Sequence, residues 1–209
     1  MAGVVSDVYM AANPSIATTN ETANNTDSGA WIVYQASVHW AWDKRVGVTV
    51  QTSPNGTSGW AVATDYVFEY AGGVIVFNTP RVSGTNNFVR IATGNYFNLT
   101  ELDLSHTWTL SLKATVADTT SFQAPGAWAV NTPTIRSGTA KVDTFRSDGR
   151  MALELGNLVA MQFYIDLATN MRWDILGWVD GIDPKSDIKG VVEEALSVTI
   201  EGDCYLRLV

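Results

Sequence analysis

The strictest pattern in this sequence is an alternation of apolar and polar residues over residues 107–117. Successive side chains of a β-strand point to opposite faces, so a period of two indicates a strand with one buried face. The pattern therefore predicts a long strand with one face on a core and one wet face. The apolar positions are Trp108, Leu110, Leu112, Ala114 and Val116, and the polar positions are Thr107, Thr109, Ser111, Lys113 and Thr115.

Shorter strand signals with turn residues between them follow one another from residue 31 to the end of the sequence. One stretch, residues 148–157, predicts a short α-helix, with Asp148 as its N-cap and Gly156 as its stop. Together these signals predict a mainly β fold, a β-sandwich or partial barrel with one short α-helix. The other predicted strands cover residues 46–51, 60–70, 74–78, 88–91, 134–145, 159–165, 172–179, 195–201 and 204–209.

Residues 1–30 are small and polar, with little periodicity. Such a segment has few apolar side chains to bury, so it predicts an N-terminal arm that is ordered only by packing on another body. We expect residues 31–209 to form a single β-sandwich domain.

The net charge excludes several classes of protein. The sequence has 209 residues, with 13 Lys and Arg against 21 Asp and Glu, for a formal charge of −8. Proteins that bind nucleic acid tightly neutralise phosphates with Lys and Arg, and this sequence has no such surplus. It also has no polybasic segment for an anionic membrane and no apolar run of ~18 residues that would span one. We therefore expect a folded protein without a membrane partner.

The sequence contains no motif of catalytic chemistry. The Gly-x-Ser-x-Gly nucleophile motif is absent, and His39 and His106 are the only histidines, so a three-histidine zinc site is impossible. Cys204 is the only cysteine, which excludes a disulfide within the chain and a thiolate zinc cluster. We expect no catalytic residue, no metal site and no cofactor, and hence a protein that is not an enzyme.

An acidic stretch containing Gly181 and Pro184 lies between two predicted strands. Its carboxylates, Asp180, Asp183 and Asp187, are oxygen ligands of the kind that calcium prefers, but their spacing does not match an EF-hand loop. The favoured interpretation is a solvated loop or a loop that contacts a partner chain.

The tryptophan content leaves a binding module open as an alternative. The sequence has 8 Trp, and exposed aromatic rings on a β-sandwich can stack on sugars. Trp60 and Trp108, however, share their strand faces with Val, Leu and Ala, which favours a core or a subunit contact. A carbohydrate-binding module is therefore an alternative and not the first reading.

Three segments in succession resemble the major tail tube proteins of long-tailed (siphovirus) bacteriophages. In the first, Trp42-Asp43-Lys44-Arg45 leads into the alternating residues 46–50. The second, residues 65–77, is similar to a hairpin that is common in phage tail proteins. The third runs from residue 110 through Asp118-Thr119-Thr120-Ser121-Phe122 and continues over residues 134–143. The succession covers most of the chain.

The resemblance implies a structural virion protein of the tail, assembled in the host cytoplasm. Such subunits form hexameric rings that stack into a tube, and their inner strands join into one barrel through which viral DNA passes during ejection. Loops and an N-terminal arm contact the next ring, and other tail proteins are further partners. A capsid decoration protein or a tail completion protein is the alternative within the same class.

The resemblance also implies roles for particular residues and for the net negative charge. An acidic inner wall repels phosphates, so DNA is cargo that is passed and not a ligand that is held. The candidate wall residues are Thr107, Thr109, Ser111, Lys113, Thr115, Ser197, Thr199 and Glu201, and the candidate inter-ring loop contains Asp180, Asp183 and Asp187.

Overall fold

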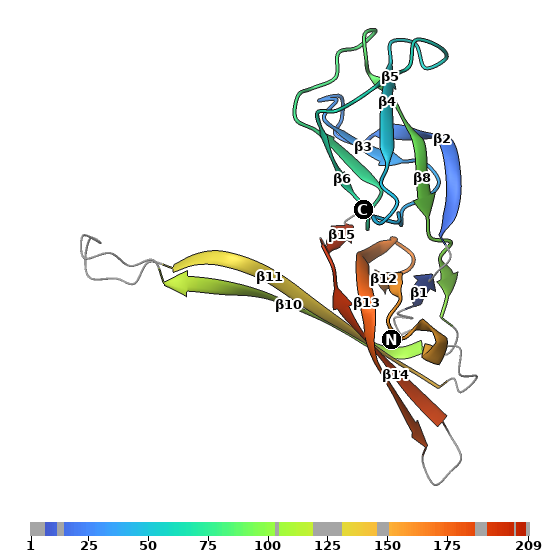
Figure 1. The fold of residues 1–209 in the computed structure, drawn as a ribbon, viewed down its shortest axis with the longest axis vertical. Coiled ribbons are helices and arrows are strands. Elements are labelled where there is room, and N and C mark those ends of the chain that lie inside the picture. Colours follow the sequence, from blue (N-terminus) through green and yellow to red (C-terminus); the bar gives the residue numbers. More distant parts are fainter. Residues whose placement is uncertain are drawn as a thin grey trace.

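The computed structural model describes residues 7–11, 15–102, 105–118, 131–145, 151–186, 192–202 and 204–207. These residues form two antiparallel β-sheets, one above the other in Figure 1. The predicted mainly β class is therefore confirmed.

The predicted α-helix over residues 148–157 is wrong for the part that the structure describes. The only helix among the described residues is η2 (Met151–Glu154), a single 3-10 turn. Gly156 ends it with a φ of +79°, a backbone shape that glycine adopts without strain. The prediction rested on an apolar stripe of Met151, Ala152 and Leu155, but Leu155 is exposed, as is Leu153. Most of the stability of a helix in a protein comes from burying such a stripe, so a longer helix gains nothing here.

The eight-stranded sheet curls into a half-barrel. The rings of Trp108 in β10 and Phe163 in β12 lie 5.2 Å apart, although three strands separate β10 from β12 in the sheet. The enclosed side chains form its core, which includes Val142, Leu196 and Val198. The strand order is β10 (Ser105–Asp118), β11 (Asn131–Thr144), β14 (Val192–Ile200), β13 (Met171–Ser186), β12 (Leu158–Asp166), β1 (Val8–Ala11) and β9 (Thr100–Glu101), and β15 (Tyr205–Arg207) pairs with β13.

The seven-stranded sheet has a core of its own, built around the fully buried Trp42. The hydroxyl of Tyr66 in β6 donates to the carbonyl of Val48, at 3.0 Å, and so links the two ends of the sheet. The strand order is β5 (Ala61–Val62), β4 (Thr49–Ser53), β8 (Phe88–Tyr96), β2 (Ile16–Asn25), β3 (Val33–Ala36), β7 (Val74–Phe77) and β6 (Tyr66–Glu69).

The described residues of the expected N-terminal arm are strands of this chain's own sheets. β1 pairs with β12, and β2 lies between β8 and β3 in the seven-stranded sheet. The side chains of β2 are mostly polar, so they do not show the alternation that predicts a strand. Backbone hydrogen bonds hold the strand in place. Its buried Glu21 accepts the backbone N–H groups of Val38 (2.9 Å) and His39 (2.8 Å), and its second oxygen lies 2.6 Å from His39 Nδ1.

Small residues allow the two sheets to approach each other closely. Ala11, Ala41, Ala71 and Ala160 pack there with Phe97, Leu158 and Leu176. Beside this cluster, the sheets share a buried ionic network. Asp174 accepts Arg172 Nε at 2.9 Å and Arg207 Nε at 2.6 Å, and both guanidinium groups lie over the ring of Trp40, at 4.3 and 5.0 Å from its centroid.

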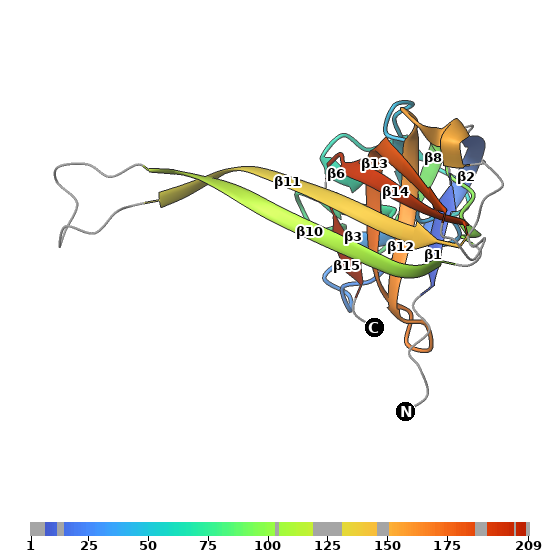
Figure 2. The same ribbon diagram turned by 90° about the horizontal axis from the view of Figure 1, so that it is seen from below.

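A long two-stranded hairpin projects from the body of the molecule (Figures 1 and 2). β10 and β11 pair along their whole length, but the pairing of β11 with β14 stops at Thr139. From Thr139 towards its tip, the hairpin has no third strand among the residues that the structure describes. We call this part the arm, residues 111–118 and 131–139.

Candidate assembly surface

The structure brings most of the predicted wall residues onto one face. Directly opposed residues of an antiparallel ladder share a face. Thr109 opposes Lys141, which opposes Ser197, and Ser111 opposes Thr139, which opposes Thr199. The polar positions of β10 are exposed, as the alternation predicted, and Trp108 packs on the core behind them. We call this surface the polar face of the four-stranded layer β10-β11-β14-β13. That this face lines a channel stays a prediction.

Carboxylates outnumber lysines on the polar face. Lys141 lies 3.6 Å from Asp143 on the same strand, and Thr199 donates a hydrogen bond to Asp180. These contacts give Asp143 and Asp180 partners on the same face. The excess negative charge of the face points outward. The register places Asp143, Asp180, Asp183, Glu193 and Glu201 on this face, against Lys113, Lys141 and Lys185.

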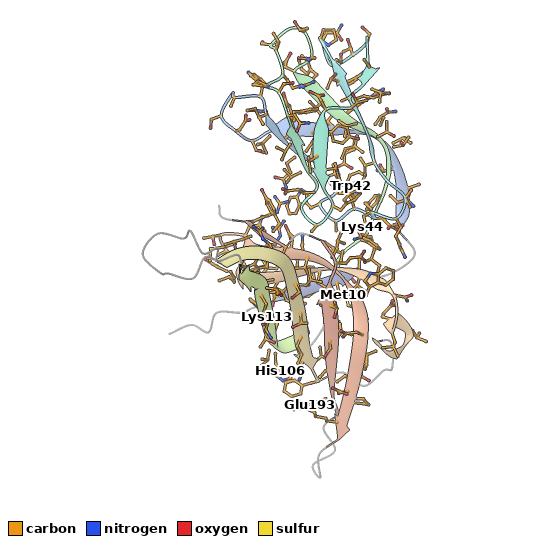
Figure 3. The ribbon with its side chains drawn as sticks, turned by 60° about the vertical axis from the view of Figure 1, so that its left-hand side comes forward. Met10, Trp42, Lys44, His106, Lys113 and Glu193 are labelled. Atoms are coloured by element: carbon orange, nitrogen blue, oxygen red, sulfur yellow. The ribbon has the colours of Figure 1, made fainter. Side chains whose placement is uncertain are left out.

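Glu201 lies at the border of the polar face, where the two sheets meet. Its carboxylate pairs with Lys44 at 2.5 Å and accepts the indole N–H of Trp178. The hydrogen bond with Lys44 lowers the pKa of Glu201, against the opposing effect of burial. Figure 3 shows Lys44 between the upper and lower sheets. Glu201 therefore joins the sheets, and its charge is partly compensated.

The acidic stretch is a strand and not a loop in its described part. Asp180 and Asp183 lie in β13, and Asp183 opposes Ala195 of β14. Gly181 and Pro184 suggested a loop, but β13 has only one neighbour here. A proline is tolerated on such an edge because no partner needs its missing N–H, and a bulge between Val179 and Gly181 absorbs the irregularity. Asp187 lies outside the described residues.

The four-stranded layer ends in two strand edges without a partner among the described residues. β10 pairs with β11 alone. β12 covers β13 only as far as Trp178, and the backbone of Gly156 and Asn157 covers Val179 through hydrogen bonds of 2.9 and 3.0 Å. Residues 180–186 of β13 therefore pair with β14 alone. Because all the pairs are antiparallel, β10 and β13 run in opposite directions. Unpaired edges of this kind are templates for pairing with another chain.

The underside of the arm is apolar and open. Leu112 is 50% exposed, and it borders a cleft of about 520 Å³ with Gly138 and Ile200. A Cβ at Gly138 would lie 2.7 Å from Ile200 Cδ1 and 2.8 Å from Leu112 Cδ2, so the close approach of these two side chains requires glycine. The cleft is also lined by Ala114, Arg136 and Cys204.

Three tryptophans have covered rings, whereas Trp178 is 37% exposed. Trp42 is buried in a core, Trp40 is covered by two arginines, and Trp60 is covered by the guanidinium of Arg90 at 4.1 Å. No group of three or more His, Cys, Asp or Glu within the described residues is placed to hold a metal ion. In the same part of the chain, no helix has the length and apolar character needed to cross a membrane.

Solved chains from gene transfer agent particles are similar in structure to this chain. No protein-family model and no curated protein matches this sequence. One similar solved chain comes from the virion of a native gene transfer agent particle, with 15% identity and a TM-score of 0.44 over 53% of this chain and 89% of that chain. Another comes from the tail of an empty gene transfer agent particle with C6 symmetry, with 12% identity and a TM-score of 0.42 over 77% of this chain and 96% of that one. Matches this distant describe a resemblance, and they assign no partner or activity to this chain.

Proposed function

We propose that this chain is a tail tube subunit, a non-enzymatic structural protein that assembles with its own copies into stacked hexameric rings. The rings enclose a conduit for viral DNA. The observation that carries the proposal is the pair of unpaired edges, β10 and residues 180–186 of β13, at the two ends of one four-stranded layer.

These edges fit head-to-tail assembly. When β10 of one copy is added to β13 of the next, the two strands run antiparallel, so the alternation of directions continues from copy to copy. A heterologous contact of this type closes into a ring when the rotation per copy allows it. Closure also covers the free edge of β13 and the part of β10 that faces it, which protects both from unspecific pairing.

The polar face supplies a suitable inner surface for such a ring. Exposed Thr and Ser hydroxyls keep it wet, and its excess carboxylates repel phosphates, so DNA passes without sticking. Channels that grip nucleic acid use a positively charged groove instead. In this arrangement the described end of the β13–β14 hairpin, with Asp183, points towards the neighbouring ring.

Electron microscopy of the purified protein, with its mass in solution measured by light scattering over a wide concentration range, tests the proposal. Rings or tubes with six-fold symmetry are expected, because both halves of the contact are present on each copy. A protein that stays strictly monomeric at high concentration would contradict the proposal.

A further inference from the structure

Two leucines are exposed beside the unpaired edge of β13, Leu153 in η2 and Leu155 in the turn that follows it. Leu153 is 76% exposed and Leu155 is 58% exposed. Their position is fixed because the following residues, Gly156 and Asn157, hydrogen-bond to Val179 of β13. Single exposed apolar residues are common, but here two leucines separated by one residue are exposed at the end of an unpaired strand, next to a pairing template.

The arm carries the complementary surface on the opposite side of the molecule. Figures 1 and 2 both show the hairpin projecting away from the body, while the coiled ribbon of η2 lies on the far side. The exposed Leu112 and its cleft therefore cannot reach the leucines of the same copy. A second copy, placed head-to-tail, can present one surface to the other.

The strand directions bring these two surfaces together. β10 of an incoming copy runs antiparallel to β13, so it passes from residue 186 towards residue 180 as its own numbering rises. At Val179 the edge is already covered by Gly156 and Asn157. When the proximal residues of β10 are placed on residues 180–186, the distal residues of β10, which begin the arm, leave the edge at Val179 and continue over η2.

The charges on the two surfaces are also complementary. Lys113 and Arg136 are exposed on the arm. The edge of β13 beside η2 carries the exposed Asp180 and Asp183. Opposite charges steer such an encounter and disfavour arm-to-arm contacts.

We propose that the arm of one copy docks on the β13–η2 surface of the next copy, with Leu112 covering Leu153 and Leu155. The occupant of this surface is a second copy of the same chain. The inference rests on the proposed function, because the docked copies are neighbours in a ring. It goes further by assigning the residues that bury apolar surface between them.

Complementary variants test this contact. Leu112→Ser disables the arm, and the double variant Leu153→Ser/Leu155→Ser disables the receiving surface. All three side chains are at least half exposed, so the fold of the single chain should survive, and thermal melting checks this. Each variant alone should remain monomeric in light scattering. A 1:1 mixture should form a dimer that grows no further, because only one intact arm and one intact receiving surface remain per pair.

Two exposed residues elsewhere provide the matched controls. Leu167→Ser in the β12–β13 turn and Val67→Ser in β6 remove similar apolar side chains and should leave ring formation unchanged. If the wild type forms rings and the folded leucine variants also do, or if their mixture stays monomeric, the docking inference is overturned while the proposed function stands. A wild type that never associates overturns both.

Discussion

At the scale of single residues, Asp27 organises the turn between β2 and β3. Its carboxylate accepts the backbone N–H groups of Trp31 (2.9 Å), Ile32 (2.6 Å) and Val33 (2.8 Å). Burial alone would raise the pKa of Asp27, but these bonds, with one from Asn25, outweigh it and lower the pKa to about 2. The native state therefore favours the ionised form.

This depressed pKa makes a prediction about acid stability. The contribution of Asp27 is present above the unfolded-state pKa of about 3.9 and is lost as the pH falls through about 2. Asp27→Asn removes the charge, so we expect a lower Tm at pH 7 and a smaller loss of Tm between pH 4 and pH 2. Thermal melting across this range measures both. A variant whose melting curve follows the wild type at every pH would refute the assignment.

Asp174 gives a second prediction at this scale. Asp174 and Arg172 are fully buried, and Arg207 completes their network. Removing one partner of a buried pair leaves an uncompensated charge, which typically costs about 3–5 kcal/mol. We expect Asp174→Ala to lower the free energy of unfolding by about this amount in urea denaturation. Arg172→Met added to Asp174→Ala should recover part of the loss, and a double variant that is less stable than the sum of the single variants would argue against charge as the cause.

At the scale of elements, the arm can be removed without breaking the backbone pairing of the rest of the sheet, although the deletion also removes Leu112 and Gly138 from the cleft that they line with Ile200. Ser111 and Thr139 are directly opposed, and every pair between β11 and β14 involves residues 139–144 of β11. Replacing residues 112–138 with Asn-Gly closes the hairpin with a two-residue turn that suits antiparallel strands. We expect a folded monomer that forms no rings or tubes, measured by light scattering and electron microscopy. Tubes formed by the shortened chain would show that the arm is not needed.

The elements also show where sequence patterns succeed. The alternation over residues 107–117 predicted β10 and its polar exposed face, because burial of one face gives the side chains a period of two. The predicted core contact is confirmed for Trp108 and Leu110 and is wrong for Leu112 and Ala114, which are exposed on the arm. β2 and the distal part of β13 were missed for a different reason. Backbone pairing holds β2, so this strand forms without an alternating side-chain pattern. The distal part of β13 lies at an edge, where Pro184 is tolerated although proline usually indicates a loop. The apolar residues Met151, Ala152 and Leu155 predicted a helix, although Leu155 faces outward.

At the scale of the whole molecule, the placement of charge matters more than its total. The formal charge of −8 excludes a nucleic-acid reader by composition, but it does not say which surface carries the acids. The register supplies this information by aligning carboxylates from β11, β13 and β14 on the polar face. The unpaired edges could not be read from the sequence either, because an edge is defined by the strand that is missing beside it.

The polar face yields a prediction about DNA. If this face lines the conduit, tubes of the wild-type protein should not retain double-stranded DNA at low salt. Thr109→Lys/Asp143→Lys adds positive charge to every copy on this face and should convert the tubes into DNA-retaining ones. The retention should fall steeply as salt rises, because it depends on phosphate neutralisation.

The matched control is Asp166→Lys/Thr169→Lys, which makes the same change of charge in the β12–β13 turn, where Thr169 donates to Asp166 at 2.8 Å. This turn lies off the polar face, so we expect tubes of the control variant to retain no more DNA than the wild type. Co-sedimentation of the tubes with a labelled DNA fragment measures the difference. Equal retention by both lysine variants would mean that the gain reflects net charge alone. In that case the polar face would be no closer to the DNA than the turn is. The prediction that the polar face lines the conduit would then be wrong, and another surface of the ring would form the inner wall.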